Sequence, residues 1–372
     1  MNKFKVLTII GTRPEIIRLS RIIPKFDKCF DHTLIHTGQN YDKNLNEIFF
    51  KDLNLRKPDF IYENSINNNI SSISKILMET DKVLKKIKPD AFFVLGDTNS
   101  ALSAIVAKKK QIPIFHYEAG NRCFDFRVPE ESNRRIVDTI SDINITYSNI
   151  SREHLIREGF QSNRVINVGS PMYEVLDFFR IKINKSNILK NLNLKKNNYL
   201  VLSCHREENV DSEENFNKLL NIIRFLNNNY NYKIVISVHP RIRDKIKSIN
   251  KNNLNKIIFC KPFPFTDYVK LQKNSKIVLS DSGTINEESS ILNFQAINIR
   301  NAHERPEADE EGTTIMSALD LKRIKRAIEY IIKNNSKTKK IVEDYNKKII
   351  SDKLVKIIMS YIGFVNENNY KK

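Results

Sequence analysis

The chain lacks several features that mark large classes of protein. Its four cysteines form no CxxC pair and no disulfide-framework spacing, which predicts free thiols in a reducing compartment. The apolar run at the N-terminus is too short for a signal peptide and is closed at once by Arg13 and Glu15. No run approaches the roughly 20 apolar residues that a membrane span requires. We therefore expect a cytoplasmic protein with no membrane span.

Several catalytic motifs are missing as well. The chain contains neither the GxGxxG fingerprint of dinucleotide-binding folds nor the GKS or GKT of a P-loop. Its seven histidines form no recognised metal-binding motif. Neither GxSxG nor the context of a catalytic cysteine is present, which counts against a hydrolase triad. We expect no metal and no cofactor.

Positive charge is plentiful, and the net charge of +19 suggests a nucleic-acid partner at first sight. The lysines, however, lie in short scattered runs, 108–110, 195–196 and 337–340, among asparagines and isoleucines. No basic stripe with interleaved aromatic residues exists, and the pattern is typical of solvated faces. We expect no nucleic-acid partner, and a positive field that helps to recruit an anionic ligand.

At 372 residues the chain is too long for one ordinary core, and two domains are expected. Apolar runs that read as buried strands alternate with helical patterns in both halves. The strands are expected at 4–10, 32–36, 91–95, 112–117 and 143–147, and again at 199–203, 233–238, 256–259, 276–279 and 296–299. Helices are expected between them, among others at 11–25, 101–109, 131–140, 241–249 and 284–292.

This alternation predicts an α/β fold with two Rossmann-like, doubly wound parallel-sheet domains. We place the boundary near Gly169 and Ser170, so that the domains are 1–169 and 170–351. The last helix, about 352–372, is amphipathic and is expected to pack back on the first domain.

Glycines are few and their positions are informative. Five of the nine lie at or just past the end of a predicted strand: Gly11, Gly38, Gly96, Gly120 and Gly283. In a doubly wound sheet these ends share one edge, where ligands bind. Such turns favour glycine in any case, but most other turns of this chain use Asn, Asp or Pro.

The stretch 115–135 follows one of these strands and is rich in charge. Glu118 and Glu130, twelve residues apart, can face one ligand as general base and general acid. Alternatively, Glu130 and Glu131 only favour the N-terminus of the helix that begins there. The stretch by itself leaves both interpretations open.

A second candidate lies at 280–284, Ser-Asp-Ser-Gly-Thr, before a predicted helix. Ser282 and Gly283 would expose backbone N–H groups and a helix N-terminus to a phosphate. Glu288, one turn further, would accept hydrogen bonds from sugar hydroxyls. Alternatively, Asp281 or Ser282 is only an N-cap.

Charged residues also follow other strands. Arg13 lies at the first βα turn, where a guanidinium can bind phosphate in a bidentate manner, and Arg18 lies one helical turn further. His205 and His239 can contact a diphosphate or move a proton, although each also suits an ordinary loop. Asp97 follows Gly96 and also suits a helix N-cap. Together, these groups in two α/β domains indicate a nucleotide-sugar enzyme.

Eight motifs carry a family resemblance: GTRPE from residue 11, GDT from 96, HYEAG from 116, PEE from 129, HRE from 205, VHP from 238, DSG from 281 and ERPE from 304. In this order and spacing the chain resembles the non-hydrolysing UDP-N-acetylglucosamine 2-epimerases over nearly its whole length. The resemblance implies a glycosyltransferase-B-like fold with a deep interdomain cleft, a UDP-sugar substrate and a homodimer.

The resemblance also implies residue roles. The catalytic positions of the family match Asp97, Glu118, Glu130 and His205. Positions that bind UDP or line the cleft match Arg13, Ser282, Gly283, Glu288 and Arg305, and we add His239 to this substrate-binding set. Arg18 matches a position that is lysine in the glucosamine enzymes, which keeps the charge and changes the geometry.

Two departures from the family pattern bear on the substrate. NRCFD from residue 121 replaces the usual LRTGD, and TGQNYD from residue 37 replaces a loop that helps some members bind an activating second substrate molecule. The variant motifs resemble the subgroup that acts on UDP-2-acetamido-2,6-dideoxy-β-L-talose and makes UDP-N-acetyl-L-fucosamine for capsule or O-antigen. We favour that substrate over the interconversion of UDP-N-acetylglucosamine and UDP-N-acetylmannosamine.

Inversion at C2 faces a chemical constraint, because C2 is not adjacent to a carbonyl. Transient oxidation would need a nicotinamide, and the missing GxGxxG argues against it. We therefore expect UDP to leave C1 as the C2 proton is removed, which forms a glycal, and then to add back with the proton on the other face. Asp97, Glu118 and Glu130 would share the acid–base work. His205 and Arg13 would stabilise the diphosphate. A retaining glycosyltransferase and a hydrolysing epimerase are the alternatives.

Overall fold

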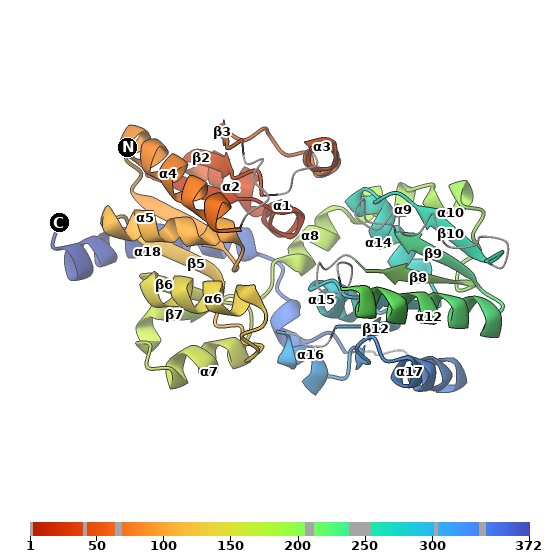
Figure 1. Ribbon diagram of the computed structural model, residues 1–372. Coiled ribbons are helices and arrows are strands. Elements are labelled where there is room, and N and C mark those ends of the chain that lie inside the picture. The colour runs from red at the N-terminus through yellow and green to blue at the C-terminus, as the bar shows by residue number, and fades with distance from the viewer. Residues whose placement is uncertain are drawn as a thin grey trace. The chain divides into compact units, whose positions relative to one another are not determined.

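The computed structural model describes residues 3–39, 43–63, 69–204, 212–237, 254–300, 304–334 and 340–372. The chain divides into two units, Met1–Asp177 with Glu343–Lys372, and Phe178–Val342. Each unit is built on a parallel sheet with helices packed against it (Figure 1). The predicted fold class, two parallel-sheet α/β domains, is confirmed.

The first unit contains seven parallel strands in the order β3-β2-β1-β4-β5-β6-β7. The strands are β1 Lys5–Ile10, β2 Asp31–His36, β3 Phe60–Ile61, β4 Ala91–Leu95, β5 Ile114–Ala119, β6 Ile143–Thr146 and β7 Val165–Asn167. The helices are α1 Arg13–Leu19, α2 Ile22–Cys29, α3 Lys43–Asp52, α4 Asn69–Ile87, α5 Ala104–Lys109, α6 Pro129–Ile140, α7 Asn149–Arg157, α8 Met172–Phe178 and α18 Ile350–Val365. Every residue of β4, β5 and β6 is buried, as a sheet covered on both faces requires.

The second unit contains six parallel strands in the order β10-β9-β8-β11-β12-β13. The strands are β8 Tyr199–Ser203, β9 Lys233–Ser237, β10 Ile257–Cys260, β11 Ile277–Ser280, β12 Ala296–Asn298 and β13 Ile315–Met316. The helices are α9 Arg180–Lys185, α10 Ile188–Asn191, α12 Glu213–Asn229, α14 Phe265–Asn274, α15 Ile285–Leu292, α16 Pro306–Glu310 and α17 Leu321–Asn334. Its core is aliphatic: Leu200 and Leu202 of β8 pack with Ile222 of α12 and Ile328 of α17.

Both sheets reverse their strand order at the equivalent point, between β1 and β4 and between β8 and β11. Open α/β sheets bind ligands beyond the carboxyl ends of the strands at such a reversal. The segments that leave these four strands begin at Gly11, Gly96, Cys204 and Asp281. The fold therefore places the GTRPE, GDT and DSG motifs at the two reversal points, whereas the HRE motif lies outside the described residues.

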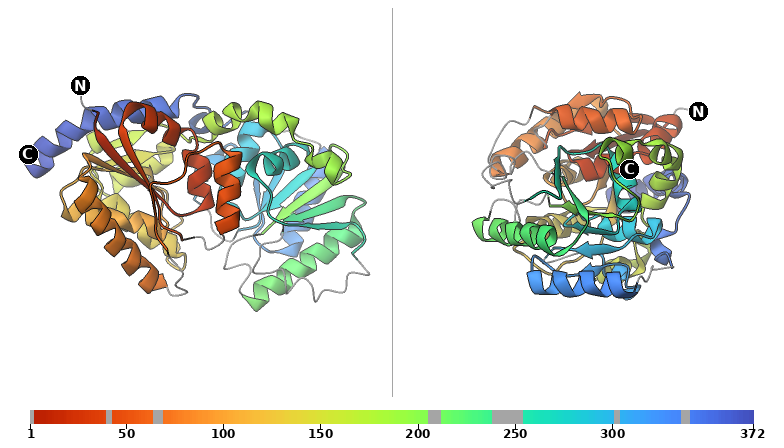
Figure 2. Two further views of the ribbon diagram at one scale, coloured as in Figure 1. Left: turned by 90° about the horizontal axis from the view of Figure 1, so that it is seen from above. Right: turned by 90° about the vertical axis from the view of Figure 1, so that its right-hand side faces the viewer.

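The units change further along the chain than the predicted boundary at residues 169–170. Helix α8 stays with the first unit because Glu174 accepts hydrogen bonds from the backbone nitrogen (2.9 Å) and the hydroxyl (2.5 Å) of Ser351. The chain returns to the first unit at Glu343, earlier than the predicted 352. Helix α18 packs against α2, and Figure 2 shows the blue helix beside the red N-terminal segment.

Two local predictions differ from the structure. The helix expected over 11–25 is two helices, because Pro24 has no N–H for a continuous helix and suits the first turn of α2 instead. The strand expected at 112–117 is β5, Ile114–Ala119, so Glu118 lies inside the strand. The helix expected at 241–249 lies outside the described residues. Within the described ranges, no helix combines the length and apolar composition needed to cross a membrane.

Candidate active site

Glu118 occupies an irregular point of β5. The register of β5 against β6 shifts between Tyr117 and Ala119, and Glu118 has a φ of 73°. Non-glycine residues are uncommon in this left-handed region, and such backbone strain clusters at functional sites. The side chain is buried, and both carboxylate oxygens lie 2.7 Å from Nη1 of Arg18. A strained strand position thus holds a buried carboxylate against a cation.

Arg18 comes from α1 and is itself buried. Its guanidinium lies 5.7 Å from the ring centroid of Tyr147, which adds a cation–π contact. Nη1 of Arg18 is within hydrogen-bonding distance of both oxygens of Glu118. Arg18 and Glu118 thus form a buried ion pair.

The turn after β4 passes close to this pair. Gly96 has a φ of 71°, and a Cβ there would lie 3.3 Å from Oε2 of Glu118. Both facts favour glycine at this position. The turn carries Asp97, so the GDT motif and Glu118 lie at one edge of the first sheet.

Helix α6 fixes Asp97. Nε of Arg134 donates to Oδ2 of Asp97 at 3.0 Å, and Nη2 of the same residue makes a second, closer contact. Nδ2 of Asn133 donates to the backbone oxygen of Asp97 at 2.9 Å. Arg134 is wholly buried, whereas the side chain of Asp97 keeps 17% of its surface exposed. Asp97 is therefore a charged, oriented carboxylate that reaches the surface of its unit.

The two acidic residues at the start of α6 have different surroundings. Glu131 is wholly buried and accepts hydrogen bonds from the backbone nitrogen of Cys123 (3.1 Å), from Arg134 (2.9 Å) and from Arg135 (2.9 Å). Glu130 is partly exposed and has no hydrogen bond or ion pair within the described part of the chain. Glu131 is held by the chain itself, whereas the side chain of Glu130 stays partly exposed.

A buried charged cluster supports this edge from below. Nε2 of His116 lies 2.8 Å from the backbone oxygen of Gly96, and Nδ1 lies 2.9 Å from Oδ1 of Asp138. Arg122 donates to Oδ2 of Asp138 at 2.7 Å. Burial alone would raise the pKa of Asp138, but His116 and Arg122 outweigh it and hold the pKa below its usual range. The cluster therefore anchors the Gly96 turn with an ionised carboxylate.

The second unit presents hydroxyls and open backbone at its reversal point. The backbone nitrogen of Ser282 donates to Oγ of Ser280 at 3.0 Å, and the hydroxyls of Ser282 and Thr284 lie 3.0 Å apart. A Cβ built on Gly283 would have its nearest neighbour, Nη1 of Arg300, at 3.8 Å. The φ of Gly283 is not positive. The backbone conformation of Gly283 and its neighbours among the described residues would both tolerate a Cβ.

Glu288 and Arg305 lie beside this turn. Glu288 is buried and accepts hydrogen bonds from Oγ1 of Thr284 (3.0 Å) and Nε2 of Gln272 (2.7 Å). Nη1 of Arg305 donates to the backbone oxygen of Glu304 at 3.3 Å, and its Nε lies 3.8 Å from Oε2 of Glu287.

The sequence and the fold of this chain match those of known proteins. Residues 25–359 match the family described as UDP-N-acetylglucosamine 2-epimerase. The chain belongs to that family. The fold and the class of enzyme, an isomerase of nucleotide sugars, agree with the predictions.

Individual relatives extend the match. A structure of UDP-N-acetylglucosamine 2-epimerase from Rickettsia bellii is 46% identical, with a TM-score of 0.92 over 100% of both chains. The UDP-GlcNAc 2-epimerase of Methanocaldococcus jannaschii, in complex with UDP-GlcNAc and UDP, is 34% identical, with a TM-score of 0.88 over 96% of this chain and 99% of that one. The UDP-2,3-diacetamido-2,3-dideoxy-D-glucuronate 2-epimerase of Pseudomonas aeruginosa is 30% identical and covers 84% of this chain and 88% of its own. All three are named 2-epimerases; two of the names give UDP-N-acetylglucosamine and the third gives a diacetamido glucuronate.

Several predicted site residues remain to be placed within this epimerase fold. Arg13 is the first residue of α1, with its guanidinium 5.9 Å from the ring centroid of Phe49. His205 and His239 lie outside the described residues. Sequence reasoning missed Arg134 as the partner of Asp97, although its spacing of three residues from Glu131 marks it as part of the same helical face.

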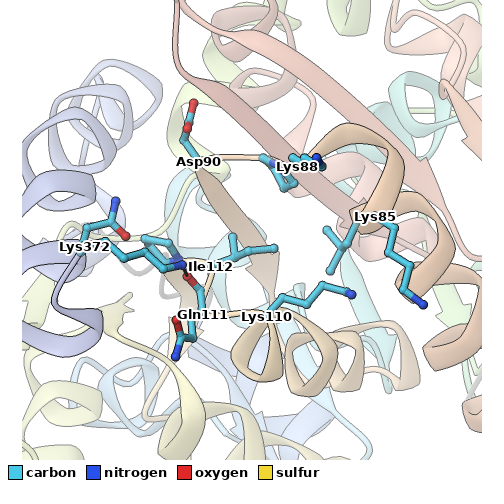
Figure 3. A pocket seen from close by; sticks show the side chains of 11 residues that line it. Lys85, Lys88, Asp90, Lys110, Gln111, Ile112 and Lys372 are labelled. Atoms are coloured by element: carbon cyan, nitrogen blue, oxygen red, sulfur yellow. Dashed lines mark hydrogen bonds between the residues drawn. The ribbon is translucent and has the colours of Figure 1, made fainter.

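A pocket of about 440 Å³ lies elsewhere, at the opposite edge of the first sheet (Figure 3). It is lined by the segments that precede β4 and β5. Two of its lysines, Lys85 and Lys110, share the carboxylate of Asp81 at 2.7 and 2.8 Å. They lie at the C-terminal ends of α4 and α5, where positive side chains stabilise the helix dipole. We therefore keep the candidate active site at the carboxyl edges.

Proposed function

We propose that this chain inverts C2 of a UDP-2-acetamido sugar by eliminating UDP and adding it back through a glycal. The observation that carries the proposal is the strained, buried Glu118, paired with Arg18 beside the turn that holds Asp97. Backbone strain and a buried charge both cost stability, and a reaction that moves a proton gives a reason to keep them.

The surroundings of the carboxylates support a division of labour. Glu118 and Asp97 each accept hydrogen bonds from a buried arginine, which favours their ionised forms. Glu130 is partly exposed and has no such partner among the described residues. We assign acceptance of the C2 proton to Glu118 and delivery of a proton to the other face to Glu130.

Each bond change is balanced in this scheme. The C2–H electron pair forms the C1=C2 double bond, and the C1–O pair leaves with the diphosphate of UDP. The return step forms the C1–O bond again, and the double-bond pair takes a proton at C2. No oxidant or reductant takes part.

In the second unit, we assign UDP binding to Ser282, Gly283 and Arg305, with Glu288 toward the sugar. Support comes from the open space at Gly283, which lets a diphosphate approach the backbone, and from the N-terminus of α15 that follows. The complex of the M. jannaschii relative with UDP-GlcNAc and UDP makes a UDP-sugar the ligand to test first. Arg13 and His205 complete the expected diphosphate contacts.

For the sugar, we propose UDP-2-acetamido-2,6-dideoxy-β-L-talose, which would give UDP-N-acetyl-L-fucosamine for capsule or O-antigen synthesis. The motifs NRCFD from residue 121 and HREENVD from residue 205 support this choice. The names of the R. bellii and M. jannaschii relatives favour UDP-N-acetylglucosamine as the competing substrate.

The test presents each UDP-sugar separately to the purified protein in D₂O and follows the products by NMR. An epimerase of this mechanism places deuterium at C2 and returns UDP to the product. A retaining glycosyltransferase leaves the C2 proton in place, and a hydrolysing epimerase accumulates UDP and free sugar, so either result would overturn the proposal. Conversion of the glucosamine compound alone would refute the 6-deoxy preference and leave the reaction class standing.

The expected homodimer is part of the proposal too. Sedimentation velocity of the purified chain tests it, and a single monomeric species at micromolar concentration would contradict it.

A further inference from the structure

Glu15 is a buried carboxylate that the proposed chemistry does not use. It is the third residue of α1, and only 2% of its surface is exposed. Its Oε2 accepts hydrogen bonds from the backbone nitrogens of Gly11 (2.8 Å) and Thr12 (2.6 Å) and from the Thr12 hydroxyl (2.8 Å). Its Oε1 accepts from the hydroxyl of Thr98 at 2.9 Å. Both oxygens are therefore engaged.

Oε2 of Glu15 accepts from residues close to it in the sequence, whereas Oε1 accepts from a distant residue. A glutamate at the third helical position commonly accepts from the backbone of the residue that caps the helix, and the Gly11 and Thr12 contacts fit this pattern. Helix capping does not explain the bond to Thr98, which lies 83 residues away on the turn after β4. Strands β1 and β4 are neighbours, with Ile9 opposite Val94, so one side chain can bridge the turns that leave them.

These two turns carry residues of the candidate active site. The β1 turn leads into Arg13, and the β4 turn carries Asp97 immediately before Thr98. A third turn joins them, because the hydroxyls of Ser100 and Thr37 lie 2.7 Å apart and each would lie within 2.3 Å of a Cβ on Gly11. Any shift of the β1 turn therefore reaches the Asp97 turn through packed contacts.

The hydrogen bond from Thr98 to Glu15, which we call the bridge, requires a buried carboxylate that costs folding free energy. Burial raises the pKa of Glu15 to about 7 in spite of the four donors, so the site disfavours the charge that its donors need. A surface glutamate would cap α1 without this cost. The buried placement is explained by the reach to Thr98.

We propose that Glu15 is a positioning residue, whose carboxylate holds the Arg13 turn and the Asp97 turn in fixed register. The inference rests on the proposed function for its kinetic readout, and on the fold alone for its structural readout. Glu15 contacts no reacting atom in this scheme and acts through the two turns.

The first test removes only the bridge. Thr98→Val keeps the shape of residue 98, deletes the hydroxyl and leaves the contacts of Glu15 with Gly11 and Thr12 in place. We expect kcat to fall about 10-fold with the affinity for UDP unchanged, because positioning acts on the transition state. The matched Thr98→Ser keeps the hydroxyl and is expected to retain kcat within about two-fold. Equal kcat in wild type and Thr98→Val, or equal losses in both variants, would overturn the inference.

The second test separates positioning from chemistry. In Glu15→Gln, the amide oxygen can take the place of Oε2 and the amide nitrogen can donate to Thr98, whose hydroxyl can turn to accept. We expect kcat within a few-fold of wild type. A loss of about 10²-fold or more is what general acid–base catalysis by Glu15 would give, and it would overturn the positioning role.

A structural readout keeps the inference apart from the proposed function. Amide hydrogen exchange in wild type, Thr98→Val and Thr98→Ser is followed by mass spectrometry in peptides that cover 11–15 and 96–100. We expect faster exchange of both peptides in Thr98→Val only. Unchanged exchange refutes the bridge, whereas a wild-type protein that exchanges no C2 hydrogen refutes the proposed epimerase and leaves the bridge to this readout.

Discussion

The two units share a strand order and differ in what they place at its reversal. In the first unit the carboxyl edge holds ion pairs, Glu118 with Arg18 and Asp97 with Arg134, supported by the buried Asp138 cluster. In the second unit the turn after β11 holds serine and threonine hydroxyls and an open glycine. One topology thus presents ion pairs in one unit, and small hydroxyl residues with an open glycine in the other.

In folds of this kind the topology determines which edge of a sheet is open to ligands, and the side chains at that edge determine which chemistry it can support. Oriented charges suit the movement of a proton, and small residues with free backbone suit a phosphate. Substitutions in either unit test this difference.

The largest effect is expected at the charged side. Glu118→Gln keeps the shape of the side chain and removes the charge and the proton acceptor. Turnover is expected to fall by about 10²- to 10⁴-fold with UDP binding retained, because general acid–base groups contribute on this scale. Steady-state kinetics and calorimetric titration with UDP measure the two quantities. Glu153→Gln, on the exposed face of α7, is the matched control, and near-normal turnover of Glu118→Gln would refute the assignment.

Acid is expected to weaken the first unit through His36. Burial lowers the pKa of His36 to about 4 from its ordinary 6.5. The folded state therefore binds this proton less well than the unfolded state, so stability is full above pH 6.5 and is lost as the pH falls toward 4. The loss amounts to roughly 3 kcal/mol when it is complete, at 1.36 kcal/mol for each pKa unit.

Urea unfolding of wild type and His36→Asn between pH 7.5 and 4.5 measures this contribution. The asparagine can still accept the hydrogen bond from the backbone nitrogen of Gly38 and carries no titratable group. We expect the stability difference between the two proteins to shrink as the pH falls. A constant difference would show that His36 does not titrate differently in the two states.

An intermediate effect is expected in the second unit, at the turn after β11. Gly283→Ala adds a methyl group where the chain has room and the backbone is unstrained, so folding is expected to be unchanged. A diphosphate seated against this backbone would clash, and the dissociation constant for UDP is expected to rise about 10-fold. Gly363→Ala in α18 is the control, where open space surrounds the site and no ligand is expected. Equal UDP affinity in both variants would remove Gly283 from the binding site.

The smallest effect is expected where α18 meets the first unit at the surface. Nζ of Lys25 lies 2.8 Å from Oδ1 of Asp352, with about a third of each side chain exposed. Exposed pairs of this kind contribute about 0.2–1 kcal/mol, and Lys25→Ala is expected to cost no more. Ile358→Ala, in the buried face of the same helix, is expected to cost about 2–5 kcal/mol. Thermal unfolding of both variants tests whether apolar packing or charge holds the helix.

Much of the scaffold was predictable because buried strands leave a direct signature. Strands β4 and β8 coincide with the apolar runs at 91–95 and 199–203, and Gly96 follows the first of them as expected. Helix α17 was not predicted, although Ile324, Ile328 and Ile331 follow the helical period and its pattern was there to be found.

The sequence identified candidate members of the site but could not identify their pairings. Glu118, Asp97 and Glu130 were identified as residues, but their partners come from positions that only the fold brings close. Arg18 and Glu118 are 100 positions apart, and no periodic signal in the sequence joins them. The shift of register that places Glu118 inside β5 likewise arises from pairing with β6, which local propensity does not encode.

The return of α18 to the first unit has a consequence for how the chain is made. The segment that completes the first unit, 343–372, is synthesised after residues 178–342. The first unit therefore still lacks α18 when all the strands of its sheet have left the ribosome. Residues 178–342 have their full set of strands earlier. We expect residues 178–342 to reach their native state first. The first unit would keep the surface of α2 that packs against α18 exposed until α18 is synthesised.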